Sequence, residues 1–466
     1  MGHLALTAAA GPGIEPYHGL GSLAAAAGIL PFAVLLGLIA VLPLVPSAAG
    51  WWDRNGNKWA VALLCAAAGI LFHLVIGGAP GRVLELLLEY LAFIALLVSL
   101  YVVSGGIHVS GAYSGLPYLN TAFLALGALL ANLVGTTGAS MILVRPLLHA
   151  NRRRRRKVHL VVFFIFIVGN TGGLLTPLGD PPLFLGFLKG VPFAWTFRLL
   201  PHWALLQALL LTIFHFLDEI VFHREELETK HALVEDLRSA ERPIQVQGWV
   251  NVALLGGILA VVLVTGYVLY PALALRSARA AAFSQLFQVQ LLAGITAIAL
   301  WIRERPGGAV PFRRNHFHPG PILEVAGLFL GIFGAMLPVL SIAQARAACW
   351  PLDRPWQLFW ASGVLSSFLD NAPTYLAFAT LASAKAGFGT ASLGPLSQQA
   401  PSLLVAVACG SVFMGATTYI GNGPNLMVKA IAEQSGVEMP SFFGYMAWSG
   451  VVLLPLFLLQ TFIFFR

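Results

Sequence analysis

Charge is scarce in this sequence. Only 10% of its 466 residues are Asp, Glu, Lys or Arg, whereas a soluble domain carries about 25%. Hydrophobic residues make up 58% of the chain, and the mean hydropathy is +0.81. This balance excludes a soluble globular domain, so we expect a protein that crosses the lipid bilayer several times.

Cysteine is almost absent as well. Cys65, Cys349 and Cys409 lie far apart in the chain, so they cannot all pair, and none has the spacing of a metal ligand. The sequence also has no cluster of thiolate and imidazole side chains, which soft transition metals prefer. A disulfide framework, a zinc site and a bound cofactor are therefore not expected.

Acidic residues are outnumbered, with 19 Asp and Glu against 27 Lys and Arg. Six of the positive charges form one run at 152–157, between apolar segments. Such a run is typical of a cytoplasmic topology anchor beside anionic lipid headgroups, and we expect no nucleic acid partner. Residues 1–28 lack the early Lys or Arg of a secretory signal peptide, and we interpret them as a short tail.

Long apolar segments occur in the same order in two halves of the chain. We expect a first transmembrane repeat at 29–217, a charged cytoplasmic linker at 218–247 and a second repeat at 248–466. Each repeat is predicted to contain three spans, a re-entrant helical hairpin, a discontinuous transmembrane helix and one further span. The number of crossings per repeat is then odd, so the second repeat is inverted. The predicted fold class is an all-α polytopic membrane protein with two inverted-topology repeats, an architecture typical of secondary transporters.

The uninterrupted spans are expected at 30–47, 59–77, 86–105, 195–217, 250–270, 287–302, 321–340 and 442–465. With the N-terminus outside, the predicted cytoplasmic loops hold 17 of the 27 Lys and Arg residues, and the external segments hold 9. Because Lys and Arg accumulate on the cytoplasmic side, we predict a bacterial-type inner (plasma) membrane protein with both termini outside. The remaining cation, Arg145, lies in the first hairpin, where it either snorkels to the interface or pairs with an anion.

The stretch 169–182 is the most informative part of the chain. It reads Gly-Asn-Thr-Gly-Gly-Leu-Leu-Thr-Pro-Leu-Gly-Asp-Pro-Pro between two apolar runs. The runs together can cross a bilayer, but the glycines and prolines exclude a continuous helix. Non-helical backbone is tolerated at membrane depth only inside protein or around a cavity. Because an intramembrane charge such as Asp180 is a functional hypothesis by default, we predict a broken helix with a binding site in its break.

A second break repeats the first. Residues 418–424 align with 176–182 at an offset of 242 residues (418 − 176), and the hairpin tips at Gly135 and Asp370 are offset by 235 (370 − 135). Breaks and tips together hold two clusters of polar side chains. The predicted site residues are Thr136, Thr137, Asn170, Thr171, Thr176 and Asp180 in the first half, and Asp370, Asn371, Thr374, Thr417, Thr418, Asn422 and Asn425 in the second.

The hydroxyl, amide and carboxylate oxygens of these residues are hard ligands, which suit hard cations. Helix ends within a break add to this, because carbonyls at C-termini attract cations and N-termini attract anions. Two structural alternatives stay open. The Thr and Asn side chains could serve only to bond neighbouring helices, and Asp180 and Asp370 could cap the N-termini of half-helices.

These motifs resemble those of the ion-transporter superfamily, which includes sodium/proton antiporters of the NhaD type, arsenite exporters and citrate or dicarboxylate carriers. Residues 170–180 look like the antiporters' Asn-x-Gly-Gly-x-x-Ser-Pro-Ile-Gly-Asp stretch, and 369–374 are similar to their Leu-Asp-Asn-x-Pro hairpin tip. Residues 418–427 look more like the arsenite and citrate carriers. The chain departs from the antiporters at 135–137, where Gly-Thr-Thr replaces an acidic Asp-Asn pair.

The resemblance implies a homodimer, often with an elevator motion, and sodium clamped between hairpin tip and broken helix in each half. On this resemblance Asp180, Asp370, Asn170 and Asn422 would hold sodium, as a transported or a coupling ion.

Three functions follow from these observations. The leading hypothesis is a sodium (cation)/proton antiporter rather than an enzyme, because a proton and a cation compete for a carboxylate in a low-dielectric site. The alternative is a sodium- or proton-coupled carrier of citrate or another small carboxylate, with Arg145 or Lys429 as partner of the anion. A third hypothesis, an intramembrane aspartyl protease using Asp180 and Asp370, is weakened by Pro177, where its motif has glycine.

Overall fold

In a computed structural model of the protein, the described residues are 17, 19–52, 54–78, 80–228, 234, 242–269, 278–346, 349–389 and 392–466. They are mostly helical, and nine helices among them are long and apolar enough to cross a membrane. The chain is therefore an integral, multi-pass membrane protein. Most of the predicted tail and the middle of the predicted linker lie outside the described residues.

The first half contains helices α3 (Ser22–Val41), η1 (Leu42–Leu44), α4 (Pro46–Trp52), α5 (Asn55–Gly77), α6 (Pro80–Gly105), α7 (Pro117–Ala150), α8 (Val158–Ile167), η2 (Thr171–Leu175), α9 (Pro181–Leu188), η3 (Phe193–Leu199) and α10 (Leu200–Glu228). The first span begins earlier than predicted, at Ser22, and it also ends earlier, because Pro43 and Pro46 interrupt helical hydrogen bonding. Helix α10 continues into the predicted linker as far as Glu228, since no Gly or Pro stops it.

The second half contains α12 (Trp249–Val264), η4 (Thr265–Leu269), α14 (Ala278–Arg303), α15 (Ala309–Arg314), α16 (Gly320–Ala345), α17 (Pro355–Ser366), α18 (Asn371–Lys385), α19 (Gly394–Gln399), α20 (Pro401–Met414), η6 (Gly415–Thr417), α21 (Gly423–Gln434) and α22 (Phe442–Phe464). The order of long helices, paired helices and broken helices follows the predicted order in both halves.

Each predicted hairpin is a pair of helices whose outer ends meet. Helix α7 folds back at Gly135, whose φ of 78° and ψ of 154° are readily adopted only by glycine. Asn120 near its start therefore reaches Asn151 just past its end, with Asn120 Nδ2 donating to Asn151 Oδ1 at 3.1 Å. Helices α17 and α18 form the second pair, closed at its outer end by a 2.8 Å ion pair between Lys385 and Asp353.

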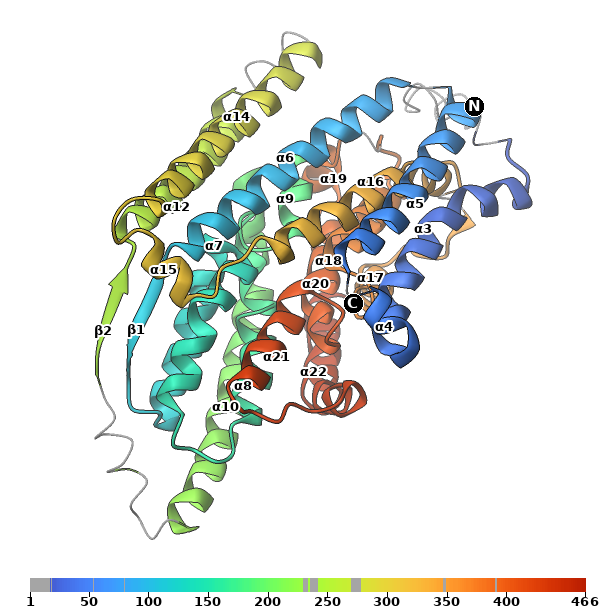
Figure 1. The fold of residues 1–466 in the computed structure, drawn as a ribbon. Coiled ribbons are helices and arrows are strands. Elements are labelled where there is room, and N and C mark those ends of the chain that lie inside the picture. The colour runs from blue at the N-terminus through green and yellow to red at the C-terminus, as the bar shows by residue number, and fades with distance from the viewer. Residues whose placement is uncertain are drawn as a thin grey trace.

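The helices form two bundles around two hydrophobic cores, to both of which α9 and α18 contribute, and each bundle draws on both halves of the chain. We call α7–α10 with α17–α22 the central bundle, whose core includes the fully buried Phe163 and Phe413. We call α3, α5, α6, α12, α14 and α16 the flanking bundle, with Phe93 and Phe333 in its core. Figure 1 shows α12 and α14 as a projecting pair on one side and α3, α5 and α16 on the other.

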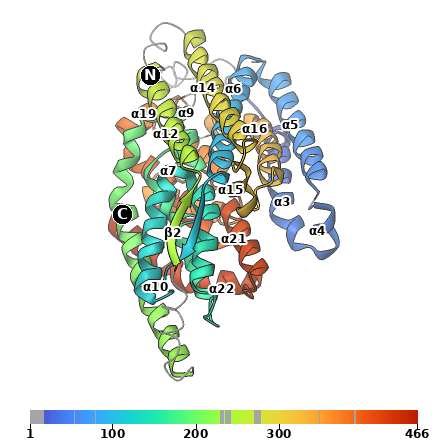
Figure 2. The ribbon, with the colours of Figure 1, turned by 60° about the vertical axis from the view of Figure 1, so that its left-hand side comes forward.

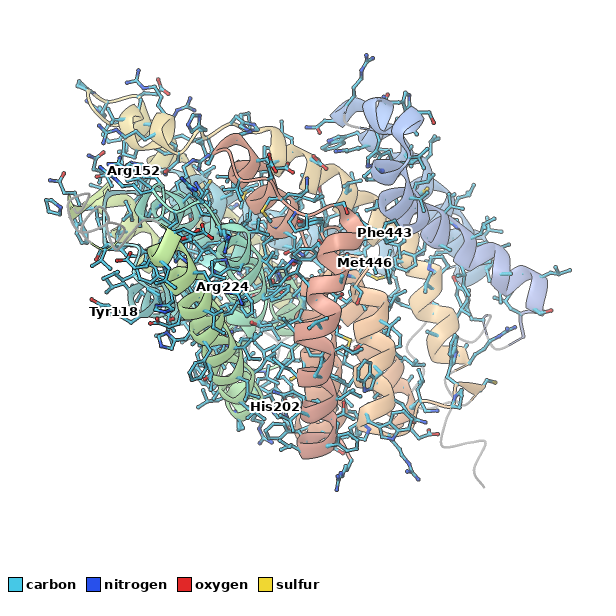
Figure 3. All side chains as sticks on the ribbon, turned by 90° about the horizontal axis from the view of Figure 1, so that it is seen from below. Tyr118, Arg152, His202, Arg224, Phe443 and Met446 are labelled. Atoms are coloured by element: carbon cyan, nitrogen blue, oxygen red, sulfur yellow. The ribbon has the colours of Figure 1, made fainter. Side chains whose placement is uncertain are left out.

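The final helices of the two halves pack against each other in the central bundle. Gln460 of α22 donates from Nε2 to the carbonyl oxygen of His202 in α10 at 2.9 Å. The His202 ring also lies 4.2 Å from the ring of Phe464, centroid to centroid. In the view from below, His202 lies beside α22 (Figure 3).

A small antiparallel sheet, which the sequence did not predict, joins the end of the linker to the first half. Strand β1 (His108–Ala112) lies beside β2 (Arg242–Gln247) in Figure 2. The two strands pair antiparallel, with His108 opposite Gln247. Both strands are short, and the alternation of apolar and polar residues is confined to the four residues 244–247, which is the lower limit of a strand signal.

The two breaks repeat each other's contacts at the offsets seen in the sequence. Thr176 Oγ1 donates to the carbonyl oxygen of Asn132 at 2.5 Å. Thr418 Oγ1, 242 residues later (418 − 176), donates to the carbonyl oxygen of Ser367, 235 residues after Asn132 (367 − 132). Each threonine thus ties its break to the hairpin of its own half.

Arg154 differs from the other residues of the basic run, because its side chain is completely buried. It bonds Asp218 Oδ1 at 2.5 Å and Glu225 Oε2 at 3.1 Å, both on α10. His159 of α8 and Asn120 of α7 also contact the Asp218 carboxylate, at 2.8 and 2.9 Å. One member of the predicted topology anchor is thus the centre of an ion-pair cluster that ties three helices together.

Candidate functional site

A cavity of about 140 Å³ lies between the two bundles. The flanking bundle lines it with α6 and α16, and the central bundle lines it with the hairpin tips and the two breaks. Among the described residues around it there is no Lys, Arg or His. Five predicted site residues line it: Thr136, Thr137, Asp180, Asp370 and Asn422.

Asp180 is buried in the cavity wall, with 1% of its surface exposed. It precedes α9, which Pro181 and Pro182 begin, but its side chain makes no capping hydrogen bond to that helix. Its Oδ1 instead accepts from Thr136 Oγ1 at 3.1 Å, and its Oδ2 accepts from Asn371 Nδ2 at 2.8 Å. The capping alternative is therefore wrong for Asp180, whose two donors come from the tips of both hairpins.

Asp370 is a helix cap. Its Oδ1 accepts from the backbone N–H of Ala372 at 3.2 Å, in the first turn of α18. The structural alternative therefore describes Asp370, although its half-buried side chain also lines the cavity. The two predicted carboxylates are consequently not equivalent.

Three asparagines join the two breaks to each other. Asn170 Nδ2 donates to Asn425 Oδ1 at 2.7 Å, and Asn422 Nδ2 donates to Asn170 Oδ1 at 3.0 Å. Asn422 lines the cavity, whereas Asn170 and Asn425 lie behind it and are completely buried. The two polar clusters predicted for separate halves are thus one connected network.

Most of the predicted threonines satisfy backbone groups. Thr171, Thr374 and Thr417 donate to the carbonyl oxygens of Phe166, Asp370 and Met414, at 2.8, 3.2 and 2.6 Å. Such bonds within a segment stabilise the irregular backbone of a break, where helical partners are missing. Thr136 and Thr137 differ, because both line the cavity.

Two residues that position the site were not predicted from the sequence. Ser366 Oγ donates to Asn371 Oδ1 at 2.8 Å, which leaves the Asn371 amide nitrogen facing Asp180. Asn132 accepts from the backbone N–H of Leu175 and donates to the carbonyl oxygen of Gly172, both at 2.7 Å. Both residues lie just before a hairpin tip. In the sequence, the signal that could have identified them is a polar residue in an otherwise apolar arm.

Close backbone packing in the second break yields a stability prediction. A Cβ at Gly421 would lie 2.6 Å from the carbonyl oxygen of Gly415, whereas one at Gly423 would have nothing within 4 Å. We expect Gly421→Ala to lower the free energy of unfolding by about 1–3 kcal/mol, because the backbone must move to admit the methyl group. Thermal unfolding of the detergent-solubilised protein measures this, and Gly423→Ala is the matched control. Equal unfolding temperatures for the two variants would show that the break is loosely packed.

The chemistry of the site follows from the neutrality of its donors. In the described structure Asp180 is hydrogen-bonded by a hydroxyl and an amide and by no positively charged side chain. A buried carboxylate without a cationic partner is costly. A hard cation or a proton would remove that cost, and Thr136, Thr137 and Asn422, whose side chains carry hard oxygen ligands, line the same cavity.

The sequence was compared with known proteins. A search of curated proteins finds no match. Residues 22–465 match a protein-family model with the description "Putative citrate transport". The matched stretch contains both hairpins, both breaks and every residue of the cavity. Because the match covers nearly the whole chain, the protein belongs to this family of transport proteins.

Proposed function

We propose that the protein is a cation-coupled secondary transporter of citrate or a closely related small carboxylate. The observation that carries the proposal is Asp180, a buried carboxylate that faces a cavity between two bundles and takes one neutral donor from each half. The family match supports the substrate class and favours transport over the protease hypothesis.

Coupling follows from the electrostatics of the cavity. Asp180 would repel an anionic substrate, and no basic side chain among the described lining residues offsets that repulsion. A cation bound at Asp180, with sodium as our first candidate, removes the repulsion and makes anion binding favourable. Two ligands that favour each other's binding in this way are thermodynamically coupled.

For the motion we propose alternating access in which the central bundle shifts against the flanking bundle, since the cavity lies on the surface between them. The repeated threonine contacts of the two breaks support two repeats, which we propose are inverted and contain re-entrant hairpins. A homodimer in a bacterial-type inner membrane, with both termini outside, completes the proposal.

Sodium/proton antiport is the second candidate function. The observation in its favour is also Asp180, because a carboxylate with only neutral donors can hold a proton and a cation in turn. The proposed carrier and the antiporter differ in whether a carboxylate crosses the membrane.

Proteoliposomes distinguish the two functions. We expect radiolabelled citrate to accumulate when an inward sodium or proton gradient is imposed, and accumulation to stop when the gradient is collapsed. Protein-free liposomes are the control. Sodium-dependent proton movement without citrate uptake would instead establish the antiporter and overturn the carrier proposal.

A further inference from the structure

A second cavity, of about 600 Å³, is lined by basic residues. Twelve of the described residues surround it, and half of these twelve carry a guanidinium, ammonium or imidazole group; none of the twelve is Asp or Glu. We call this the basic cavity, after His108, Arg145, His149, Arg152, Lys157 and His316.

The basic groups come from separate parts of the chain. His108 begins β1, Arg145 and His149 belong to the last turns of α7, and Lys157 immediately precedes α8. Arg152 is exposed and lies at the outer edge of the molecule in the view from below (Figure 3). Several distant segments therefore converge on one hollow, which a single basic run by itself does not explain.

Two helices connect the basic cavity to the Asp180 cavity. On the second arm of α7, Thr137 lines the Asp180 cavity, and Arg145, eight residues later, lines the basic cavity. On α21, Met427 lines the first, and Ser435, immediately after the helix, lines the second. Eight residues of helix span about 12 Å and turn the side chain by about 80° beyond two full turns, which keeps it within one broad face of the helix. The two cavities are thus neighbours along shared walls.

Arg145 is positioned to receive an anion. Its Nη1 is buried and has no hydrogen-bond partner among the described residues. Lys429, the other basic residue considered as a partner for the substrate, is occupied by a 2.7 Å ion pair with Glu433. The positive field also acts on His108: burial lowers the pKa of its imidazole, and Arg314 and Arg145 lower it further, against the hydrogen bond between His108 Nδ1 and Asn315 Oδ1, which raises it.

We propose that the basic cavity is a vestibule that binds a soluble di- or tricarboxylate at one mouth of the transport path. This inference rests on the proposed carrier function, since it supplies the cationic groups that the Asp180 cavity lacks. Its volume falls in the range of small-molecule sites, and converging like charges concentrate an oppositely charged substrate. Two or more carboxylates can contact several of the six groups at once.

The test is citrate binding to the full-length protein in nanodiscs of phosphatidylcholine, measured by isothermal titration calorimetry. We expect Arg145→Gln to weaken citrate binding about tenfold, as expected for the loss of a hydrogen bond to a charged group. The matched control is Arg153→Gln, an exposed arginine of the same run that does not line the cavity, with an expected change below about twofold. If Arg145→Gln does not fold, the double variant Arg152→Gln/Lys157→Gln tests the same prediction, because both residues line the exposed side of the basic cavity.

Two further arms separate the possible outcomes. Repeating the titration in an Asp180→Asn background should preserve the Arg145 dependence, because the vestibule is a separate site. Unchanged citrate affinity in Arg145→Gln would overturn the vestibule while leaving citrate transport by the wild type intact. Arg145-dependent binding in a protein that transports no citrate would overturn the carrier function instead.

Nanodiscs containing cardiolipin test the remaining source of acidic oxygens, a lipid headgroup. If Arg145→Gln loses only cardiolipin binding, the cavity holds a lipid headgroup and the proposal fails.

Discussion

Asp180→Asn is expected to reduce gradient-driven citrate uptake at least about 100-fold, because a lost charged ligand costs about 3 kcal/mol or more. The substituted side chain keeps the size of the original, and its oxygen can still accept the hydrogen bond from Thr136. What disappears is the negative charge that binds the coupling cation, together with the oxygen that accepts from Asn371 Nδ2. Uptake in proteoliposomes at saturating sodium and at several pH values measures the effect.

Asp353→Asn is the matched control for this experiment. Asp353 makes an ion pair with Lys385 at 2.8 Å, but its side chain is 73% exposed, so we expect uptake close to wild type. A monodisperse gel-filtration profile shows that each variant is folded. If Asp180→Asn transports citrate with an unchanged dependence on the cation gradient, Asp180 does not bind the coupling ion and the proposed mechanism is wrong.

Asp218→Asn is expected to cause the largest loss of stability, about 3–5 kcal/mol, because it leaves the buried Arg154 without its closest partner. Glu225 would remain at 3.1 Å, but His159 and Asn120 would also lose their charged acceptor. Thermal unfolding in detergent should show a midpoint several degrees below that of the wild type.

The comparison for this prediction is Glu228→Gln, which breaks the pair between Arg156 and Glu228. That pair has a similar separation, 2.7 Å, but both side chains are about half exposed. We expect a change below about 1 kcal/mol, since solvent screens such pairs. A similar loss in both variants would mean that the Arg154 cluster is open to water and that its burial is not what stabilises it.

The order of the helices and the positions of both breaks could be predicted from the sequence, because glycine and proline change backbone conformation locally. The contact between Asp180 and Thr136 was also predictable, because the first hairpin tip and the first break follow one another within the same half of the chain. The bond from Asn371 to Asp180 was not predictable. It crosses between halves, and aligning the halves with each other suggests only contacts within each of them.

The different roles of similar residues also required the structure. Asp180 and Asp370 look alike as acidic residues in apolar surroundings, yet one faces neutral side chains and the other caps a helix. Arg154 and Arg153 are neighbours in one run, yet only Arg154 is buried among carboxylates. The orientation in which α10 and α18 pack determines which side chains meet Arg154 and Asp370. Apolar helix surfaces specify that orientation only weakly.

By itself, the sequence determined that the protein crosses a membrane, where its helices break and which polar groups lie in the breaks. These properties depend on composition and on backbone chemistry, which act over a few residues. Only the tertiary structure decided which polar groups meet across the two halves, which carboxylate lacks a backbone partner and where the basic residues converge. Those contacts join segments far apart in the chain, so they exist only after the two bundles have packed.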